Sequence, residues 1–208
     1  MEEKYIISIG RQLGSGGREI ANRLAEQLNI PVYDKKLLEV TAKETGIDAT
    51  IFESADEKES NPFMRGIFAL KGVMSSYPIG MGSCMDGDRL FELQSEVMRN
   101  IVAKESCIII GRCAEYVLRD HPGITSIYIT ADKADRIARI AGKEAVSNEK
   151  AKELMEKGDK KRRSYHDYYA TTRWGEAQSY DLCINSSRLG IEGTVDFLYN
   201  FIKSRTKG

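Results

Sequence analysis

Short apolar runs alternate along the chain with longer segments in which apolar residues recur at helical spacing. Apolar, β-branched runs bounded by turn-forming residues occupy positions 5–9, 31–33, 106–111, 125–130 and 180–185. Their length and composition predict strands. Because these runs are apolar throughout and alternate with helical segments, they favour a parallel sheet with helices on both faces, which is a doubly wound α/β architecture.

Two of the intervening segments have a clear amphipathic pattern. In residues 18–28 the apolar face consists of Ile20, Ala21, Leu24, Ala25 and Leu28. In residues 190–203 it consists of Ile191, Val195, Leu198 and Ile202. Spacings of three and four residues place each set on one side of a helix, so both segments predict helices that pack on the sheet.

Two regions interrupt this alternation. Residues 48–89 are rich in Gly, Ser and Met and lack a period, which predicts an insert, or loops around a short helix near residues 63–70. Residues 142–174 are dominated by charge and predict an exposed helical hairpin with Ser147 as an N-cap. Neither region is expected to belong to the core around the sheet.

The composition is that of one soluble globular domain. The 208 residues are 41% hydrophobic and 30% charged, and 31 Lys and Arg balance 31 Asp and Glu. A net charge of zero disfavours a general attraction to nucleic acid or to an anionic membrane. Four cysteines without a CxxC pair and two histidines give no zinc-like spacing, so we expect reduced thiols. The sequence has neither a signal-peptide pattern nor an apolar run of membrane-spanning length, so we expect a cytoplasmic location.

A glycine-rich turn follows the first predicted strand. Gly14, Gly16 and Gly17 lie between this strand and a helix expected to open at Arg18. Such a turn aims backbone N–H groups and the positive end of a helix dipole at an anion, and glycine lets a phosphate approach the backbone. The alternative is a plain turn that uses glycine only to reverse the chain. The segment therefore predicts a phosphate site, with that alternative left open.

The turn departs from the usual phosphate-binding pattern G-x-x-x-x-G-K-[ST] at the positions that carry charge. If Gly16 is the second glycine of the pattern, Arg11 stands at the first glycine. Gly17 then stands at the lysine and Arg18 at the Ser or Thr. The lysine normally reaches the β- and γ-phosphates, and the hydroxyl normally binds Mg²⁺. Other residues have to supply both functions.

Candidates for both functions lie within or close to the turn. Arg11 and Arg18 flank it, and a guanidinium binds phosphate through two parallel hydrogen bonds. A cation at the start of a helix is unfavourable unless an anion lies beside it, so the position of Arg18 favours a bound phosphate. Ser15 is the hydroxyl of the turn, and Asp34 and Glu19 can hold Mg²⁺ directly or through water.

Further arginines lie after the third predicted strand and near the charged region. Arg112 follows an apolar strand, at the end where open α/β sheets bind ligands, although a surface arginine that closes a turn is an equal alternative. Arg136 and Arg139 lie three residues apart on a predicted helix. Residues 160–163 are all Lys or Arg and follow Asp159. This cluster is a solvated face, a weak nucleic-acid patch, or part of a lid that closes over a phosphoryl group; the phosphate turn favours the lid.

Aromatic residues follow this basic cluster, at Tyr165, Tyr168, Tyr169 and Trp174. We expect them to anchor the charged segment to the sheet, in preference to stacking on a base. We expect no chemistry from His166, which lies among them.

Together these motifs resemble those of the cytidylate kinase-like proteins, a branch of the P-loop nucleoside monophosphate kinases. The resemblance rests on ISIGRQLGSGGREIANRLAEQLNIPVYDKKLL, then IIIGRCAEYVL, then DKKRRSYHDYY and YDLCINSSRLGIEGTV. It runs from about residue 5 to about residue 203. It implies an α/β, P-loop kinase-type three-layer fold with a parallel sheet, an acceptor-binding insert at about 48–104 and a helical lid at about 142–177. The single domain would then have its core at about 4–47, 105–141 and 178–205.

The resemblance also implies roles for individual residues. Gly14, Ser15, Gly16, Gly17 and Arg18 match the phosphate loop of this family. Together with Arg11 and Glu19, which were assigned above from their position beside the turn, they are the residues expected to bind the nucleotide cofactor. Those expected to act in catalysis are Arg18, Arg112, Arg136, Arg139 and Arg162, and Asp159 matches a position next to the lid. Ser15 and Asp34 are the expected Mg²⁺ ligands.

The resulting hypothesis is an ATP- and Mg²⁺-dependent phosphotransferase that phosphorylates CMP or another small phosphorylated acceptor. The expected partners are a nucleotide donor and that acceptor, without nucleic acid or membrane, and the oligomeric state is left open. One alternative is a nucleotide-binding regulatory or sensor protein with a kinase fold and little or no turnover. Another is a small-molecule kinase outside nucleotide metabolism, which would share the donor site.

Overall fold

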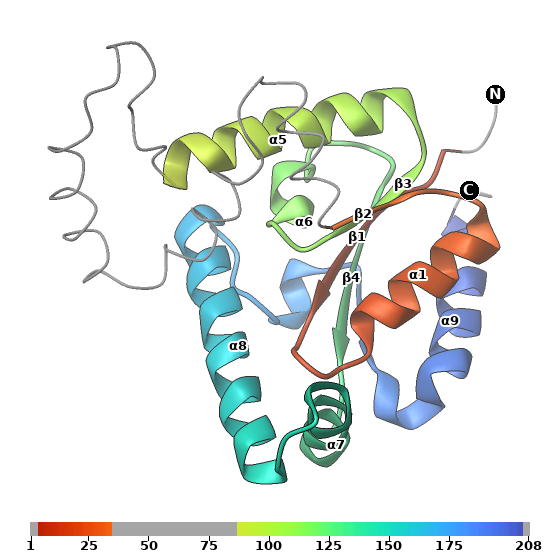
Figure 1. Cartoon of the computed structure of the whole chain (residues 1–208). Helices are drawn as coiled ribbons and strands as arrows, with labels where there is room; N and C mark the ends of the chain where they lie inside the picture. The colour runs from red at the N-terminus through yellow and green to blue at the C-terminus, as the bar shows by residue number, and fades with distance from the viewer. Residues whose placement is uncertain (1–3, 35–86, 206–208) are drawn as a thin grey trace, which may run out of the picture. The chain divides into compact units, whose positions relative to one another are not determined.

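A parallel sheet forms the centre of the fold. The computed structural model describes residues 4–34 and 87–205 (Figure 1). These residues form a five-stranded sheet in the order β2-β3-β1-β4-β5. The strands are β1 (Ile6–Arg11), β2 (Val32–Tyr33), β3 (Cys107–Ile110), β4 (Ile124–Thr130) and β5 (Leu182–Asn185), and all neighbours are parallel. The five predicted strands are confirmed with end shifts of up to two residues, the largest being the extension of β1 to Arg11 and the later start of β5 at Leu182.

The chain divides into two compact units. One comprises residues 1–34 and 98–208, and the other comprises residues 35–97. The sheet and every predicted site residue belong to the first unit. Helix α5 (Gly87–Lys104) begins in the second unit and ends in the first. The helix predicted near residues 63–70 and the part of the predicted core at 35–47 lie outside the described residues.

Strand register aligns the carboxyl ends of the strands. Ile9 of β1 lies opposite both Ile110 of β3 and Ile127 of β4. The residues that leave each strand therefore emerge along the same edge of the sheet. In open sheets of this kind ligands bind at that edge, near the point where successive connections turn to opposite sides. Here the first connection carries the chain from β1 past β3 to β2, and β4 lies on the other side of β1.

Helices α1 (Gly17–Leu28) and α9 (Ser186–Arg205) cover one face of the sheet and lie next to each other (Figure 1). Both predicted apolar faces pack into one core with the strands. The helical residues that are fully buried there are Ile20, Ala21, Leu24, Ala25, Val195, Leu198 and Ile202. Helix α9 begins earlier than predicted and has a kink at Gly190, whose φ of 68° suits glycine.

Two helices beyond the carboxyl edge form the hairpin that the charged region predicts in part. They are α7 (Lys133–Glu144) and α8 (Asn148–Tyr169), and they pack through Ile140, Ala151 and Met155. The Ser147 hydroxyl accepts a hydrogen bond from the Lys150 N–H at 3.2 Å, so the predicted N-cap is confirmed. The prediction that both helices of the hairpin lie within residues 142–174 is wrong. Residues 148–169 form one continuous helix, and its partner in the hairpin is α7.

A buried aromatic cluster ties the segment after α8 to the sheet. Tyr128 of β4 contacts Trp174 edge to face at 5.5 Å between ring centroids, and it contacts Tyr180 at 4.9 Å. Trp174 is thus the anchor that the sequence predicts, whereas Tyr168 is largely exposed. The remaining described helices are α6 (Ala114–Val117) and a short 3₁₀ turn, Ala177–Ser179. Across the described ranges, no helix has both the length and the hydropathy of a membrane span.

Candidate active site

The glycine-rich turn joins β1 to α1 at the carboxyl edge of the sheet. Gly14 and Gly16 have φ values of 79° and 77°, in the left-handed region that favours glycine. Gly16 is the N-cap of α1, so the helix begins at Gly17, one residue before the predicted start. As a glycine, this N-cap offers no side chain to the N–H groups of the first helical turn. The geometry is that of a helix N-terminus available to an anion.

Ser15 has a structural role inside the turn. Its side chain is fully buried, and its hydroxyl accepts a hydrogen bond from the Gly17 N–H at 3.3 Å. Its carbonyl oxygen accepts a hydrogen bond from the Ser186 hydroxyl at 2.7 Å, which links the turn to the start of α9. Binding of Mg²⁺ by Ser15 stays a prediction, and in this conformation its hydroxyl is engaged within the protein.

Side chains from α7 and α8 hold the backbone of the turn. Arg136 Nε donates to the Leu13 carbonyl at 2.7 Å, and Arg139 Nη1 donates to the Gly14 carbonyl at 3.2 Å. From α8, Asp159 Oδ1 accepts from the Leu13 N–H at 2.8 Å and Oδ2 pairs with Arg136. The sequence did not predict this supporting role. Direct contact of Arg136 or Arg139 with a phosphoryl group stays a prediction.

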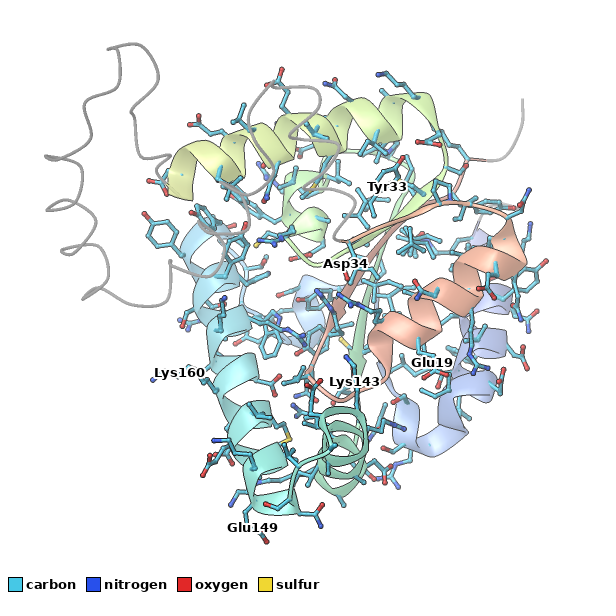
Figure 2. All side chains as sticks on the ribbon, viewed as in Figure 1. Glu19, Tyr33, Asp34, Lys143, Glu149 and Lys160 are labelled. Atoms are coloured by element: carbon cyan, nitrogen blue, oxygen red, sulfur yellow. The ribbon has the colours of Figure 1, made fainter. Side chains whose placement is uncertain are left out.

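An arginine cluster that includes the carboxylate of Asp34 lies beside the turn. Asp34, which follows β2 and is labelled in Figure 2, lies beside the start of α1. It pairs with Arg18 of α1 and lies 3.8 Å from Arg11 Nη2. The Arg11 side chain is 17% exposed, whereas the Arg18 side chain is 54% exposed. The Arg11 guanidinium lies over Gly111 at the end of β3, in the space that a Cβ at Gly111 would occupy. The structure thus brings together three predicted site residues, Arg11 at the end of β1, Arg18 on α1 and Asp34 after β2.

Electrostatics within this cluster favour a bound anion. Burial and the positive charge of Arg162 lower the pKa of Arg11 to about 9, although Asp34 opposes the change. Arg18 and Arg112 act in the same direction as Arg162. Arg162 Nη1 donates to the Arg11 carbonyl at 3.1 Å, and burial lowers its pKa as well. An anion placed among these guanidinium groups would relieve their repulsion.

Arg112 lies between the end of β3 and the end of α8. Arg112 and Cys113 have φ values of 58° and 54°, a left-handed conformation that costs about 1–3 kcal/mol at each non-glycine residue. Strain of this kind is concentrated at functional sites. The Arg112 guanidinium lies 5.7 Å from the centre of the Tyr165 ring. A contact of this type fixes the direction of the arginine.

Glu19 is directed along α1 rather than toward the cluster. Its carboxylate pairs with Arg23 at 2.7 Å, and Arg23 also pairs with Glu192 on α9. Figure 2 shows Glu19 on the part of α1 near α9, away from Asp34. Within residues 4–34 and 87–205, no three His, Cys, Asp or Glu side chains form a group that could hold a metal ion. Asp34 pairs with Arg18 in the arginine cluster, and the carboxylate of Asp159 acts on Arg162 of the same cluster.

A buried histidine is a second feature that the sequence did not predict. His166 Nε2 lies 2.8 Å from Glu115 Oε1, and Nδ1 lies 3.2 Å from Asp167 Oδ1. Asp167 Oδ1 also accepts from the Trp174 N–H at 2.9 Å. The cluster links α6, which follows Arg112, to the end of α8. Glu115 and His166 are 51 positions apart, so their spacing along the chain gives no signal.

We expect the stability of the protein to fall as pH rises through the titration of His166. Burial alone would lower the pKa of His166, but hydrogen bonds to Glu115 and Asp167 outweigh burial and raise this pKa above its ordinary value of 6.5. A group whose pKa is higher in the folded than in the unfolded protein stabilises the fold. Its full contribution is present at pH values below the unfolded pKa and is lost as pH rises through the folded pKa. Urea denaturation at a series of pH values measures it. His166→Gln should flatten the slope, and an unchanged slope in that variant would contradict the assignment.

A glycine-rich loop between the first strand and helix of a parallel sheet of this order defines the P-loop kinase class of fold. The cytidylate kinase-like family matches residues 6–188, which is most of the sequence. The chain belongs to this family, which confirms the resemblance carried by its motifs. A comparison with curated proteins found no match.

Solved structures are similar to this chain over nearly its whole length. An uncharacterized protein from Eubacterium ventriosum ATCC 27560 is 30% identical, with a TM-score of 0.71 over 97% of this chain and 99% of that chain. A shikimate kinase from Bacteroides thetaiotaomicron is 12% identical, with a TM-score of 0.53 over 96% and 98% of the two chains. A gluconokinase from Sinorhizobium meliloti 1021 is 9% identical, with a TM-score of 0.54 over 100% and 96%. The two kinases show the fold alone, and they confirm the predicted P-loop kinase-type α/β sheet.

Proposed function

We propose that the protein is an ATP- and Mg²⁺-dependent phosphotransferase. Its acceptor would be a nucleoside monophosphate, with CMP the first to test, or another small phosphorylated molecule. The cluster of Arg11, Arg18, Arg112 and Arg162 beside the glycine turn is the observation that carries the proposal. Phosphoryl transfer needs positioning and charge neutralisation rather than a covalent intermediate, and such a cluster suits that need.

The residues of the site fit a nucleotide polyphosphate. The positive φ values of Gly14 and Gly16 and the uncapped start of α1 suit close approach of a phosphate group to backbone N–H groups. Asp34 is an oxygen donor of the kind Mg²⁺ prefers, and its partner Arg18 is exposed enough to move aside. Bound Mg²⁺ would neutralise charge on the phosphates. Arg112, at the end of β3, would meet the phosphate of the acceptor.

A coupled assay for phosphoryl transfer tests the proposal. ATP and Mg²⁺ are supplied with a panel of nucleoside monophosphates and sugar phosphates, and with shikimate and gluconate because the similar structures include a shikimate kinase and a gluconokinase. We expect one phosphorylated acceptor to stand out. Transfer to an unphosphorylated acceptor alone would instead support a small-molecule kinase outside nucleotide metabolism.

Two variants on α8 separate the site from a general effect of charge. Arg162→Ala removes the guanidinium that contacts the Arg11 carbonyl, and we expect kcat/KM to fall about 100- to 1,000-fold. Lys160→Ala is the control, because Lys160 is exposed and points away from α1 and the turn (Figure 2). Equal activities of the two variants would contradict the proposed site.

One observation favours a nucleotide-binding sensor with little turnover. The Asp34 carboxylate, the candidate Mg²⁺ ligand, is paired with Arg18 and close to Arg11. If those contacts persist when ATP binds, Mg²⁺ is held poorly and transfer is slow. Calorimetry that detects ATP binding, together with no transfer to any acceptor in the panel, would support this second function. A protein that binds no nucleotide would contradict both.

A further inference from the structure

The side chains at positions 11 and 17 compete for the same space. A Cβ built on Gly17 would lie 2.7 Å from the Arg11 Cβ and 3.2 Å from its Cγ. Side-chain carbons do not approach so closely, so something must shift if both positions carry a side chain. The first atom of each side chain is involved, and a change of rotamer leaves a Cβ in place. Positions 11 and 17 are therefore coupled through packing.

The usual phosphate-binding pattern resolves this competition in the opposite way. In G-x-x-x-x-G-K-[ST], glycine stands where this chain has Arg11, and lysine stands where it has Gly17. In both arrangements one of the two positions is glycine and the other carries a cation. This chain therefore has one cation and one glycine at this pair of positions, in the reverse order of the usual pattern.

The guanidinium of Arg11 extends to the centre of the candidate site. It lies over Gly111, directly before Arg112, and within 3.8 Å of Asp34. It therefore lies between the donor turn and the arginine expected to meet the acceptor. Arg18, the other arginine of the turn, is largely exposed and pairs with Asp34 at the edge of this cluster.

We propose that Arg11 is a catalytic residue that takes over the role of the loop lysine. The usual loop carries this lysine at the position of Gly17, and here the cation stands at position 11, the other position of the coupled pair. This inference rests on the proposed function. In the reaction, the bond from the γ-phosphorus to the oxygen it shares with ADP breaks, and a bond to a phosphate oxygen of the acceptor forms. The leaving oxygen keeps the electron pair and becomes part of ADP. Arg11 forms no covalent bond; it binds the oxygens of the transferred group and balances their charge.

Exchange of the two residues is the sharpest test. Arg11→Gly should lower kcat/KM about 100- to 1,000-fold and should also abolish any preference for ATP over ADP in calorimetry. Gly17→Lys alone should be inactive and less stable, because its Cβ meets that of Arg11. The double variant Arg11→Gly with Gly17→Lys restores the usual arrangement. We expect it to transfer phosphate at least tenfold faster than Arg11→Gly and to be more stable than Gly17→Lys.

Further variants keep the test decisive if glycine weakens β1. Arg11→Ala should lose activity and ATP preference as Arg11→Gly does, and Arg11→Lys should retain an intermediate level of both. Arg18→Ala should lower kcat/KM and the preference for ATP over ADP less than Arg11→Ala does, because Arg18 is largely exposed at the edge of the cluster. Near-native activity and ATP preference in Arg11→Ala, or a larger loss in Arg18→Ala, would overturn the proposal.

Failure of this inference is distinguishable from failure of the proposed function. If the wild-type protein binds ATP but phosphorylates no acceptor, the proposed function fails. The ratio of ATP to ADP affinities in the Arg11 variants then decides the inference, because Arg11 should still contact the γ-phosphate. If the wild-type protein binds no nucleotide, both are overturned.

Discussion

Asp159→Ala should lower the free energy of unfolding by about 3–5 kcal/mol. The two carboxylate oxygens of Asp159 hold the Leu13 N–H and Arg136, and Arg136 is 6% exposed. Removal of the carboxylate leaves a buried guanidinium without its counter-ion and a backbone donor without its acceptor. Because Leu13 lies in the glycine turn, nucleotide affinity should fall as well. Urea denaturation measures the first effect, and calorimetry with ATP below the unfolding transition measures the second.

Glu156→Ala is the matched control for Asp159→Ala. Glu156 lies one turn earlier on α8 and pairs with Lys133 of α7 at 3.6 Å, with both side chains exposed. An exposed pair contributes about 0–1 kcal/mol, so this variant should remain close to the wild type in stability and in nucleotide affinity. Similar losses in the two variants would show that α8 tolerates no truncation here, and would contradict a specific role for Asp159.

The apolar pattern predicts the sheet well because burial on both faces leaves a strong signal. Strands such as β3, with four consecutive buried residues, stand out from the charged helices around them. The pattern does not contain the order of the strands. That order depends on which apolar faces meet, and neither the pattern nor the resemblance to a kinase family predicted it.

Helix α8 shows why the support of the turn escaped prediction. Met155, Asp159, Arg162 and His166 recur at spacings of four, three and four residues, which places them on one side of the helix. Only one of the four is apolar, so this buried side reads as solvated when judged by hydropathy. The partners of this side lie far away in the chain, at residues 11, 13 and 115. A period of polar residues signals a buried face only when those partners are known.

The sequence also left open which arginine compensates for the missing lysine. Arg11 and Arg18 flank the turn on its two sides, and both carry a guanidinium group. They differ in burial, because Arg11 ends an internal strand whereas Arg18 lies on the solvent side of α1. The contact on which the proposal for Arg11 relies, with Gly111, joins residues 100 positions apart in the chain.

Gly14→Ala should weaken ATP binding at least tenfold, a loss of about 1.4 kcal/mol or more. At a φ of 79° a residue with a Cβ is strained by about 1–2 kcal/mol. The new Cβ would also lie 2.6 Å from the Arg136 carbonyl oxygen and 3.0 Å from the Arg136 Cα. Both atoms belong to the backbone of α7, so no change of rotamer relieves the overlap. Either the turn or α7 must move, and each holds the other through Arg136 and Arg139.

Gly142→Ala separates this effect from the general result of adding a methyl group to a glycine. Gly142 lies on α7 and is exposed. A Cβ added at this position would have no contact within 4 Å with another part of the described structure. In a helix, alanine is favoured over glycine by about 1 kcal/mol, so this variant should be as stable as the wild type or more stable. Its ATP affinity should be unchanged, because nothing near the turn is altered. If Gly14→Ala also kept its affinity for ATP, the close packing of the turn on α7 would not be what shapes the phosphate site.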